Sequence, residues 1–121
     1  MARIGVIGGG AFGTALACVV RRSGHETVIW AREPEVVLAI NRDSANPVFL
    51  PGIRLAPGIV ATEDIGAAAA RADFLLLAPP AQHMRAVTAR LRPLLARGTP
   101  VVTCSKGVER AKNWAEPQSE G

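Results

Sequence analysis

The sequence has no tyrosine and few other aromatic residues, since phenylalanine and tryptophan together make up 4% of its 121 residues. Its formal net charge is +4, but the arginines are scattered, with no basic run and no interleaved aromatic side chains. Nucleic-acid-binding proteins gather their basic residues into a patch. The pattern therefore argues against a nucleic-acid partner, and the positive charge can equally attract an anionic cofactor or substrate.

Long apolar runs are also missing. A membrane-spanning helix needs about 18 to 20 apolar residues, and the longest runs here are short segments such as 15–20 and 74–78. The N-terminus imitates a secretion signal, because "ALAC" resembles a lipoprotein cleavage box. However, only Arg3 supplies positive charge, and the glycines at positions 5, 8, 9, 10 and 13 break the apolar helix that a signal needs. We expect neither a leader nor membrane insertion.

Cysteine is scarce as well. Cys18 and Cys104 stand without the spacing of metal ligands, which favours reduced thiols in a cytoplasmic protein. We expect both to be small core residues. His83 opens a helix without an acidic partner, and the sequence shows no Ser-His-Asp arrangement. We predict no metal site and assign no catalytic residue within this chain.

The residues that are present indicate a folded protein, with 49% apolar and 20% charged residues. Helical spacing begins at Phe12, where Phe12, Leu16, Val19 and Val20 fall on one face, and Gly24 provides a stop. Strands are predicted at 3–7, 27–31, 59–61, 74–78 and 101–105, and further helices at 33–42, 63–71 and 82–95.

Three features interrupt or end this pattern. Pro93 should kink the last helix or end it early. Residues 46–58 contain three prolines and two glycines, which predicts a loop. Beyond Glu109 the sequence shows no periodicity, so we assign 1–110 to one domain and 111–121 to a loose tail.

Alternating strands and helices predict an α/β fold, a doubly wound parallel sheet of five strands in a single domain. Ligands of such sheets bind at the carboxyl ends of the strands, where the strand order reverses. Functional motifs should therefore directly follow strands.

One motif does so. Gly8, Gly10 and Gly13 form a Gly-x-Gly-x-x-Gly pattern between the first predicted strand and the first helix. In a dinucleotide-binding turn, the first glycine permits the tight turn, the second lets a pyrophosphate approach, and the third allows close helix packing. The helix N-terminus then attracts the phosphates. A lone match to this pattern is weak, but its position predicts dinucleotide binding.

The cofactor preference depends on the end of the second strand. NAD-preferring sites usually carry an acidic residue there, whereas this chain has Arg32, and Glu33 follows where a helix cap is expected. Arg32 can pair with a 2′-phosphate, which favours NADP over NAD. The alternative is a solvated arginine beside Glu35.

These residues resemble the bacterial-type NAD(P)-dependent glycerol-3-phosphate dehydrogenases, in their N-terminal cofactor-binding domain. The likeness covers about residues 3–110, with a Rossmann-type fold. It is carried by "IGVIGGGAFGTALA", "SGHETVIWAREPEVV", "NPVFLPGIRLAP", "FLLLAPPAQHMRAV" and "VVTCSKGVE". The proline-rich loop and the Ser105-Lys106-Gly107 triplet are the specific parts, because many dehydrogenases share the glycine motif.

The resemblance implies roles for individual residues. Ala11 and Phe12 would contact the cofactor, although the first is often serine in the family. Arg32 would flank the adenosine ribose, and Lys106 would be shared between cofactor and glycerol phosphate. The implied reaction is reversible hydride transfer between NAD(P)H and dihydroxyacetone phosphate, giving sn-glycerol 3-phosphate for phospholipid synthesis.

The resemblance also implies that something is missing. Family members continue into a helical domain that carries the general acid/base lysine, so we expect this chain alone to be inactive. Two alternatives stay open: a non-catalytic dinucleotide-binding module, and the front half of a ketopantoate reductase or 6-phosphogluconate-type enzyme. The proline-rich loop and the Ser105-Lys106-Gly107 triplet argue against the second alternative. The oligomeric state is undecided, and a homodimer is left open.

Overall fold

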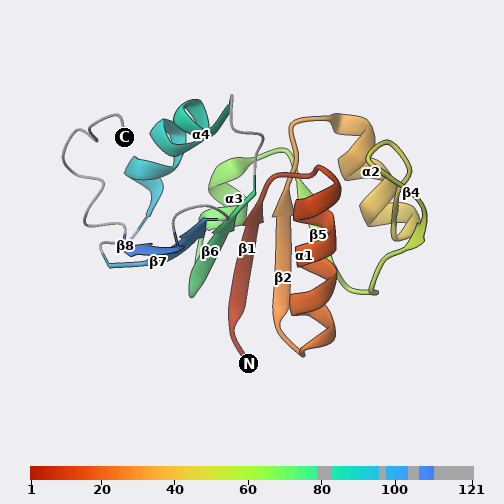
Figure 1. Cartoon of the computed structure of the whole chain (residues 1–121), viewed down its shortest axis with the longest axis horizontal. Coiled ribbons are helices and arrows are strands. Elements are labelled where there is room, and N and C mark those ends of the chain that lie inside the picture. The colour runs from red at the N-terminus through yellow and green to blue at the C-terminus, as the bar shows by residue number, and fades with distance from the viewer. Residues whose placement is uncertain (79–82, 96–97, 104–106, 111–121) are drawn as a thin grey trace.

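The computed structural model describes residues 1–78, 83–95 and 98–103, together with the backbone of 107–110. Its main sheet has six strands in the order β5-β2-β1-β6-β7-β8 (Figure 1). All neighbouring pairs are parallel except β7 and β8, which are antiparallel. The strands are β1 (Arg3–Ile7), β2 (Glu26–Trp30), β5 (Val60–Thr62), β6 (Phe74–Leu77), β7 (Pro100–Thr103) and β8 (Gly107–Arg110).

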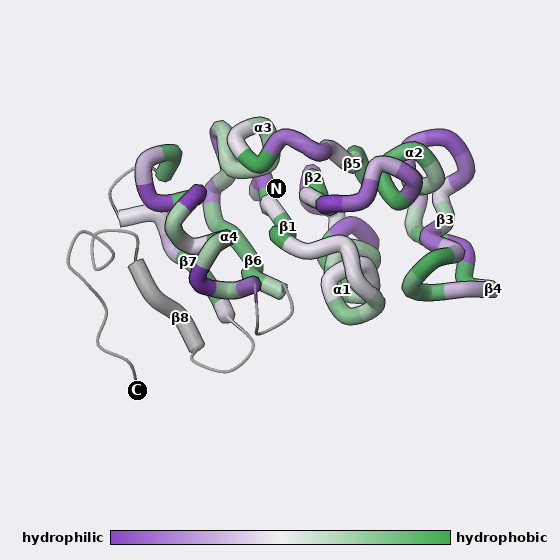
Figure 2. Tube along the Cα trace, turned by 90° about the horizontal axis from the view of Figure 1, so that it is seen from above, coloured by the Kyte–Doolittle hydropathy of each residue, from purple (hydrophilic) through white to green (hydrophobic). Residues whose placement is uncertain are grey.

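Helices cover both faces of this sheet. The helices are α1 (Ala11–Arg22), α2 (Pro34–Asp43), α3 (Ile65–Ala69) and α4 (Met84–Leu91), the last continued by a 3-10 turn, η2 (Arg92–Leu94). Residues of α1 and α2 pack with Ile4 and Val6 of β1 in one core. Residues of α3 and α4 pack with Ile7 in a second core. Figure 2 shows the sheet between α1 and α3. The predicted doubly wound α/β fold is confirmed.

The buried face of α1 differs from the apolar face that its sequence suggests. Small residues face the sheet, namely Gly13, Thr14, Ala17 and Cys18. Phe12 and Val19 are instead 57% and 59% exposed. The helix starts so close to the end of β1 that a Cβ on Gly13 would overlap the carbonyl oxygen of Gly8, the residue that follows this strand. Small side chains are therefore what this contact accepts, and the expectation that Cys18 is a core residue is confirmed.

The predicted loop at 46–58 is wrong in part. It contains β4 (Leu50–Arg54), which pairs antiparallel with β3 (Ala45–Asn46) in a separate two-stranded sheet. A ribbon of two strands consists only of edge strands, where a proline and a glycine are tolerated. Pro51 therefore does not prevent pairing, because the paired residues are Ala45 with Arg54 and Asn46 with Leu50.

Other boundaries also differ from the prediction. The helix predicted at 63–71 has only five residues, and the Asp64 carboxylate accepts a hydrogen bond from the Gly66 N–H at its start. The early end at Pro93 is confirmed, since α4 stops at Leu91 and Pro93 lies in η2. Strand β8, which extends one residue past Glu109, was not predicted. Cys104 and the tail at 111–121 lie outside the described residues.

Candidate functional site

The strand order reverses between β1 and β6. β2 lies on one side of β1, while the chain returns on the other side to form β6, which pairs Ile7 with Leu77. The chain leaves β1 at Gly8, whose N–H donates to the Trp30 carbonyl oxygen over 3.0 Å. In doubly wound sheets, the carboxyl ends of the strands at such a reversal bind ligands. The glycine motif therefore lies where a binding site is expected.

Each glycine of the motif meets different surroundings. Gly8 has a φ of 131°, a conformation that favours glycine. A Cβ on Gly9 would lie 2.5 Å from the Ala31 Cβ, and one on Gly13 would overlap the Gly8 carbonyl. At Gly10, by contrast, no atom of the described residues comes within 4 Å of a Cβ. The turn is closely packed on its inner side and open at Gly10.

The open glycine leads directly into α1. Gly10 is the N-cap of this helix of 12 residues and has no side chain to cap it. The first turn contains no acidic residue, whereas the last turn contains Arg21 and Arg22. Ala11 and Phe12 of the first turn are both exposed. The N–H groups of a helix start carry partial positive charge, so this end of α1 can accept a phosphate group.

Arg32 lies at the same edge of the sheet, two residues after the end of β2. Its exposed side chain donates from Nη1 to Nε2 of His83 over 2.8 Å. His83 stands at the start of α4, so this contact joins the segment after β2 to the start of that helix. Glu33 is the N-cap of α2, as expected, but its side chain makes no capping hydrogen bond. Lys106 lies outside the described residues.

The sequence predicts no role for Asn46, yet this residue contacts the glycine turn. Its side-chain amide donates to the Gly9 carbonyl oxygen over 2.9 Å and to the Thr14 hydroxyl over 2.8 Å. Both Asn46 and Thr14 are fully buried. The only signal in the sequence is an asparagine before a proline, which indicates a turn but says nothing of a distant partner.

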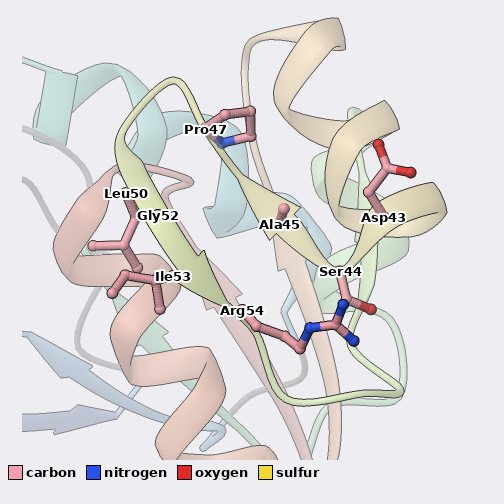
Figure 3. A pocket seen from close by; sticks show the side chains of 8 residues that line it. All are labelled: Asp43, Ser44, Ala45, Pro47, Leu50, Gly52, Ile53 and Arg54. Carbon is pink, nitrogen blue, oxygen red and sulfur yellow. The ribbon is translucent and has the colours of Figure 1, made fainter.

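A separate hollow lies between the end of α2 and the β3–β4 ribbon (Figure 3). It is lined by Asp43, Ser44, Ala45, Pro47, Leu50, Gly52, Ile53 and Arg54. None of the residues predicted for the dinucleotide site lines it. Across the described ranges, no group of three or more His, Cys, Asp or Glu side chains could hold a metal ion. The same ranges contain no helix long and apolar enough to cross a membrane.

Comparison with known proteins identifies the family of this fold and turn. Residues 3–116 match the family described as "NAD-dependent glycerol-3-phosphate dehydrogenase N-terminus". The chain belongs to this family. The predicted resemblance is thereby confirmed, and the alternative of a ketopantoate reductase or 6-phosphogluconate-type front half is set aside. The match to the glycerol-3-phosphate dehydrogenase family continues past residue 110, where the likeness was expected to end.

Individual relatives agree with the family match. The chain is 55% identical over 109 residues to glycerol-3-phosphate dehydrogenase (NAD(P)+) from Paramagnetospirillum magneticum, covering 90% of this chain and 39% of the relative. It is 53% identical to the enzyme of that name from Parvibaculum lavamentivorans, covering 90% and 32%. The crystal structure of the Coxiella burnetii glycerol-3-phosphate dehydrogenase superimposes with a TM-score of 0.78 at 26% identity, covering 84% of this chain and 31% of that one. This chain thus spans about a third of each relative.

Proposed function

We propose that the chain binds NAD(P)(H) as the N-terminal, dinucleotide-binding part of a glycerol-3-phosphate dehydrogenase. The observation that carries the proposal is the open Gly10 at the start of α1, at the point where the strand order reverses. The family match supports it independently. The enzyme would transfer a hydride reversibly between NAD(P)H and dihydroxyacetone phosphate, giving sn-glycerol 3-phosphate. A cytoplasmic location belongs to the same proposal.

The residues present fit the cofactor. Gly8 makes the tight turn, and Gly10 leaves room for the pyrophosphate beside it. The backbone N–H groups of Ala11, Phe12 and Gly13 in the first turn of α1 would donate to the phosphate oxygens. Bound NAD(P)H supplies the hydride of the reaction.

Two further roles belong to the proposal. Arg32, by its charge and its position after β2, would contact the 2′-phosphate of NADP. Lys106, by the family resemblance, would hold both the cofactor and the substrate phosphate. We assign residues 1–110 to the dinucleotide-binding domain and 111–121 to a tail. A non-catalytic dinucleotide-binding module remains the second candidate function, because the open Gly10 at the start of α1 supports dinucleotide binding alone.

Replacing Arg32 by alanine should weaken NADPH binding by about tenfold or more and leave NADH binding nearly unchanged. A charge-assisted hydrogen bond contributes about 1.5–3 kcal/mol, and only NADPH carries the 2′-phosphate. Calorimetric titration of the wild-type chain and of R32A with each dinucleotide measures the effect. The wild-type titrations also test dinucleotide binding itself.

A matched control removes the same charge elsewhere. Arg22 is exposed in the last turn of α1, at the opposite end of the helix from Gly10, so R22A should bind both cofactors like the wild type. Equal losses for NADPH and NADH in R32A would reject the NADP preference. Absence of heat with both dinucleotides, on folded wild-type protein, would reject the proposed function.

A further inference from the structure

Asn46 connects three segments through one side chain. It lies at the end of β3, fully buried, and its Nδ2 donates to the Gly9 carbonyl oxygen and to Thr14 Oγ1. Its Oδ1 accepts from the Phe49 N–H over 3.3 Å. The amide thereby holds the glycine turn, the start of α1 and the link between β3 and β4 in one arrangement.

The chemistry of this contact is specific to an amide. Two N–H donors and one oxygen acceptor of the Asn46 side chain are used together. An aspartate of the same shape has no N–H to offer. A smaller residue would remove this donor and leave the buried Gly9 carbonyl with only the longer hydrogen bond that the Thr14 hydroxyl donates to it, at 3.4 Å.

The orientation of Gly9 determines the orientation of the next N–H group. A peptide unit is planar and trans, so its C=O and N–H point in opposite directions. Asn46 binds the carbonyl of the Gly9–Gly10 peptide, so the Gly10 N–H is turned away from Asn46. It is at Gly10 that the turn is open. The buried amide therefore sets the direction of a donor at the open position.

We propose that Asn46 is a positioning residue that holds the glycine turn ready for the pyrophosphate of the dinucleotide. This inference rests on the dinucleotide-binding function proposed above. Asn46 itself is fully buried and acts through Gly9, without touching the ligand. This role gives a reason for the position of β3, the strand after α2. Its residue Asn46 supplies the amide donor to the Gly9 carbonyl.

The test compares two asparagines that make similar contacts in different places. N46A should weaken NADPH binding by about tenfold, because the turn is no longer held in its binding conformation. Asn41 of α2 also pairs with backbone, donating to the Ala61 carbonyl over 2.9 Å and accepting from the Ala61 N–H over 2.8 Å. N41A should lower the melting temperature but change the NADPH dissociation constant less than twofold.

Thr14 provides a second pair of variants should N46A fail to fold. T14V removes the hydroxyl that accepts from Asn46 and itself donates to the Gly9 carbonyl over 3.4 Å, while keeping the shape of the side chain, whereas T14S keeps the hydroxyl and both contacts. T14V should weaken NADPH binding several-fold, and T14S should bind like the wild type.

The possible outcomes distinguish failure of this inference from failure of the proposed dinucleotide binding. Unchanged affinity in N46A, equal losses in N46A and N41A, or equal affinities in T14V and T14S would each overturn the role of Asn46 alone. Failure of the folded wild-type chain to bind NADPH or NADH would overturn the proposed function, and this inference with it.

Discussion

Replacing Gly10 by valine should weaken NADPH and NADH binding by at least about a hundredfold while leaving the melting temperature nearly unchanged. Within the described chain, a Cβ at this position meets no atom within 4 Å. The backbone, with φ −76° and ψ −171°, is extended and suits valine. The new side chain would occupy the space where the pyrophosphate approaches the N–H groups of α1. A hundredfold loss corresponds to about 2.8 kcal/mol, comparable to one or two charge-assisted hydrogen bonds.

A matched variant places the same side chain farther along the helix. Ala15 is exposed on α1, more than one turn beyond the N-cap, so A15V places a valine side chain outside the glycine turn. Calorimetry should show wild-type affinity for A15V and no measurable heat for G10V, with thermal melts confirming that both are folded. If G10V binds either dinucleotide like the wild type, the cofactor does not approach the turn at Gly10.

The second large effect concerns catalysis. We expect the 121-residue chain to oxidise NADPH or NADH with dihydroxyacetone phosphate at least about a hundredfold more slowly than a full-length family enzyme. Reduction of a ketone needs a proton donor beside the developing alkoxide, and a positioned general acid contributes about 10²–10⁴-fold. The resemblance gives Lys106 a binding role and places the general acid in the helical domain of the family.

The activity measurement follows absorbance of the reduced cofactor, with a full-length relative as positive control and substrate-free samples as background. Turnover within about tenfold of the control would show that these residues contain a complete site. It would also reject the non-catalytic module. Binding of NADPH without turnover agrees with the proposal that this chain binds the dinucleotide while the helical domain of the family carries the general acid.

The main sheet could largely be predicted from sequence, for a physical reason. A parallel strand buried on both faces is a short continuous apolar run, and β1 (Arg3–Ile7) spans the predicted residues 3–7, in which a buried run follows Arg3. The glycine motif could also be predicted from the sequence, because its pattern reflects backbone geometry within a few residues. Gly8 has the positive φ, Gly10 is open, and Gly13 touches the turn, as the motif implies.

Features that depend on distant partners could not be predicted. Asn46 acts on Gly9, 37 residues earlier in the chain, and Arg32 meets His83, 51 residues later. Local sequence carries no sign of either pairing. The buried face of α1 was misleading for a related reason, because the closeness of α1 to the sheet selects small side chains over large apolar ones such as Phe12.

Dinucleotide binding at the glycine turn is tested most directly by titrating the isotope-labelled chain with NADPH and following the backbone amides by NMR. The proposed site predicts saturable shifts of Gly8, Gly10 and the first turn of α1, at 11–13. It predicts no comparable shifts at Ser44 or Gly52, which line the hollow beside the β3–β4 ribbon. Shifts confined to that hollow, or amides of the glycine turn that stay unmoved at saturating NADPH, would contradict it.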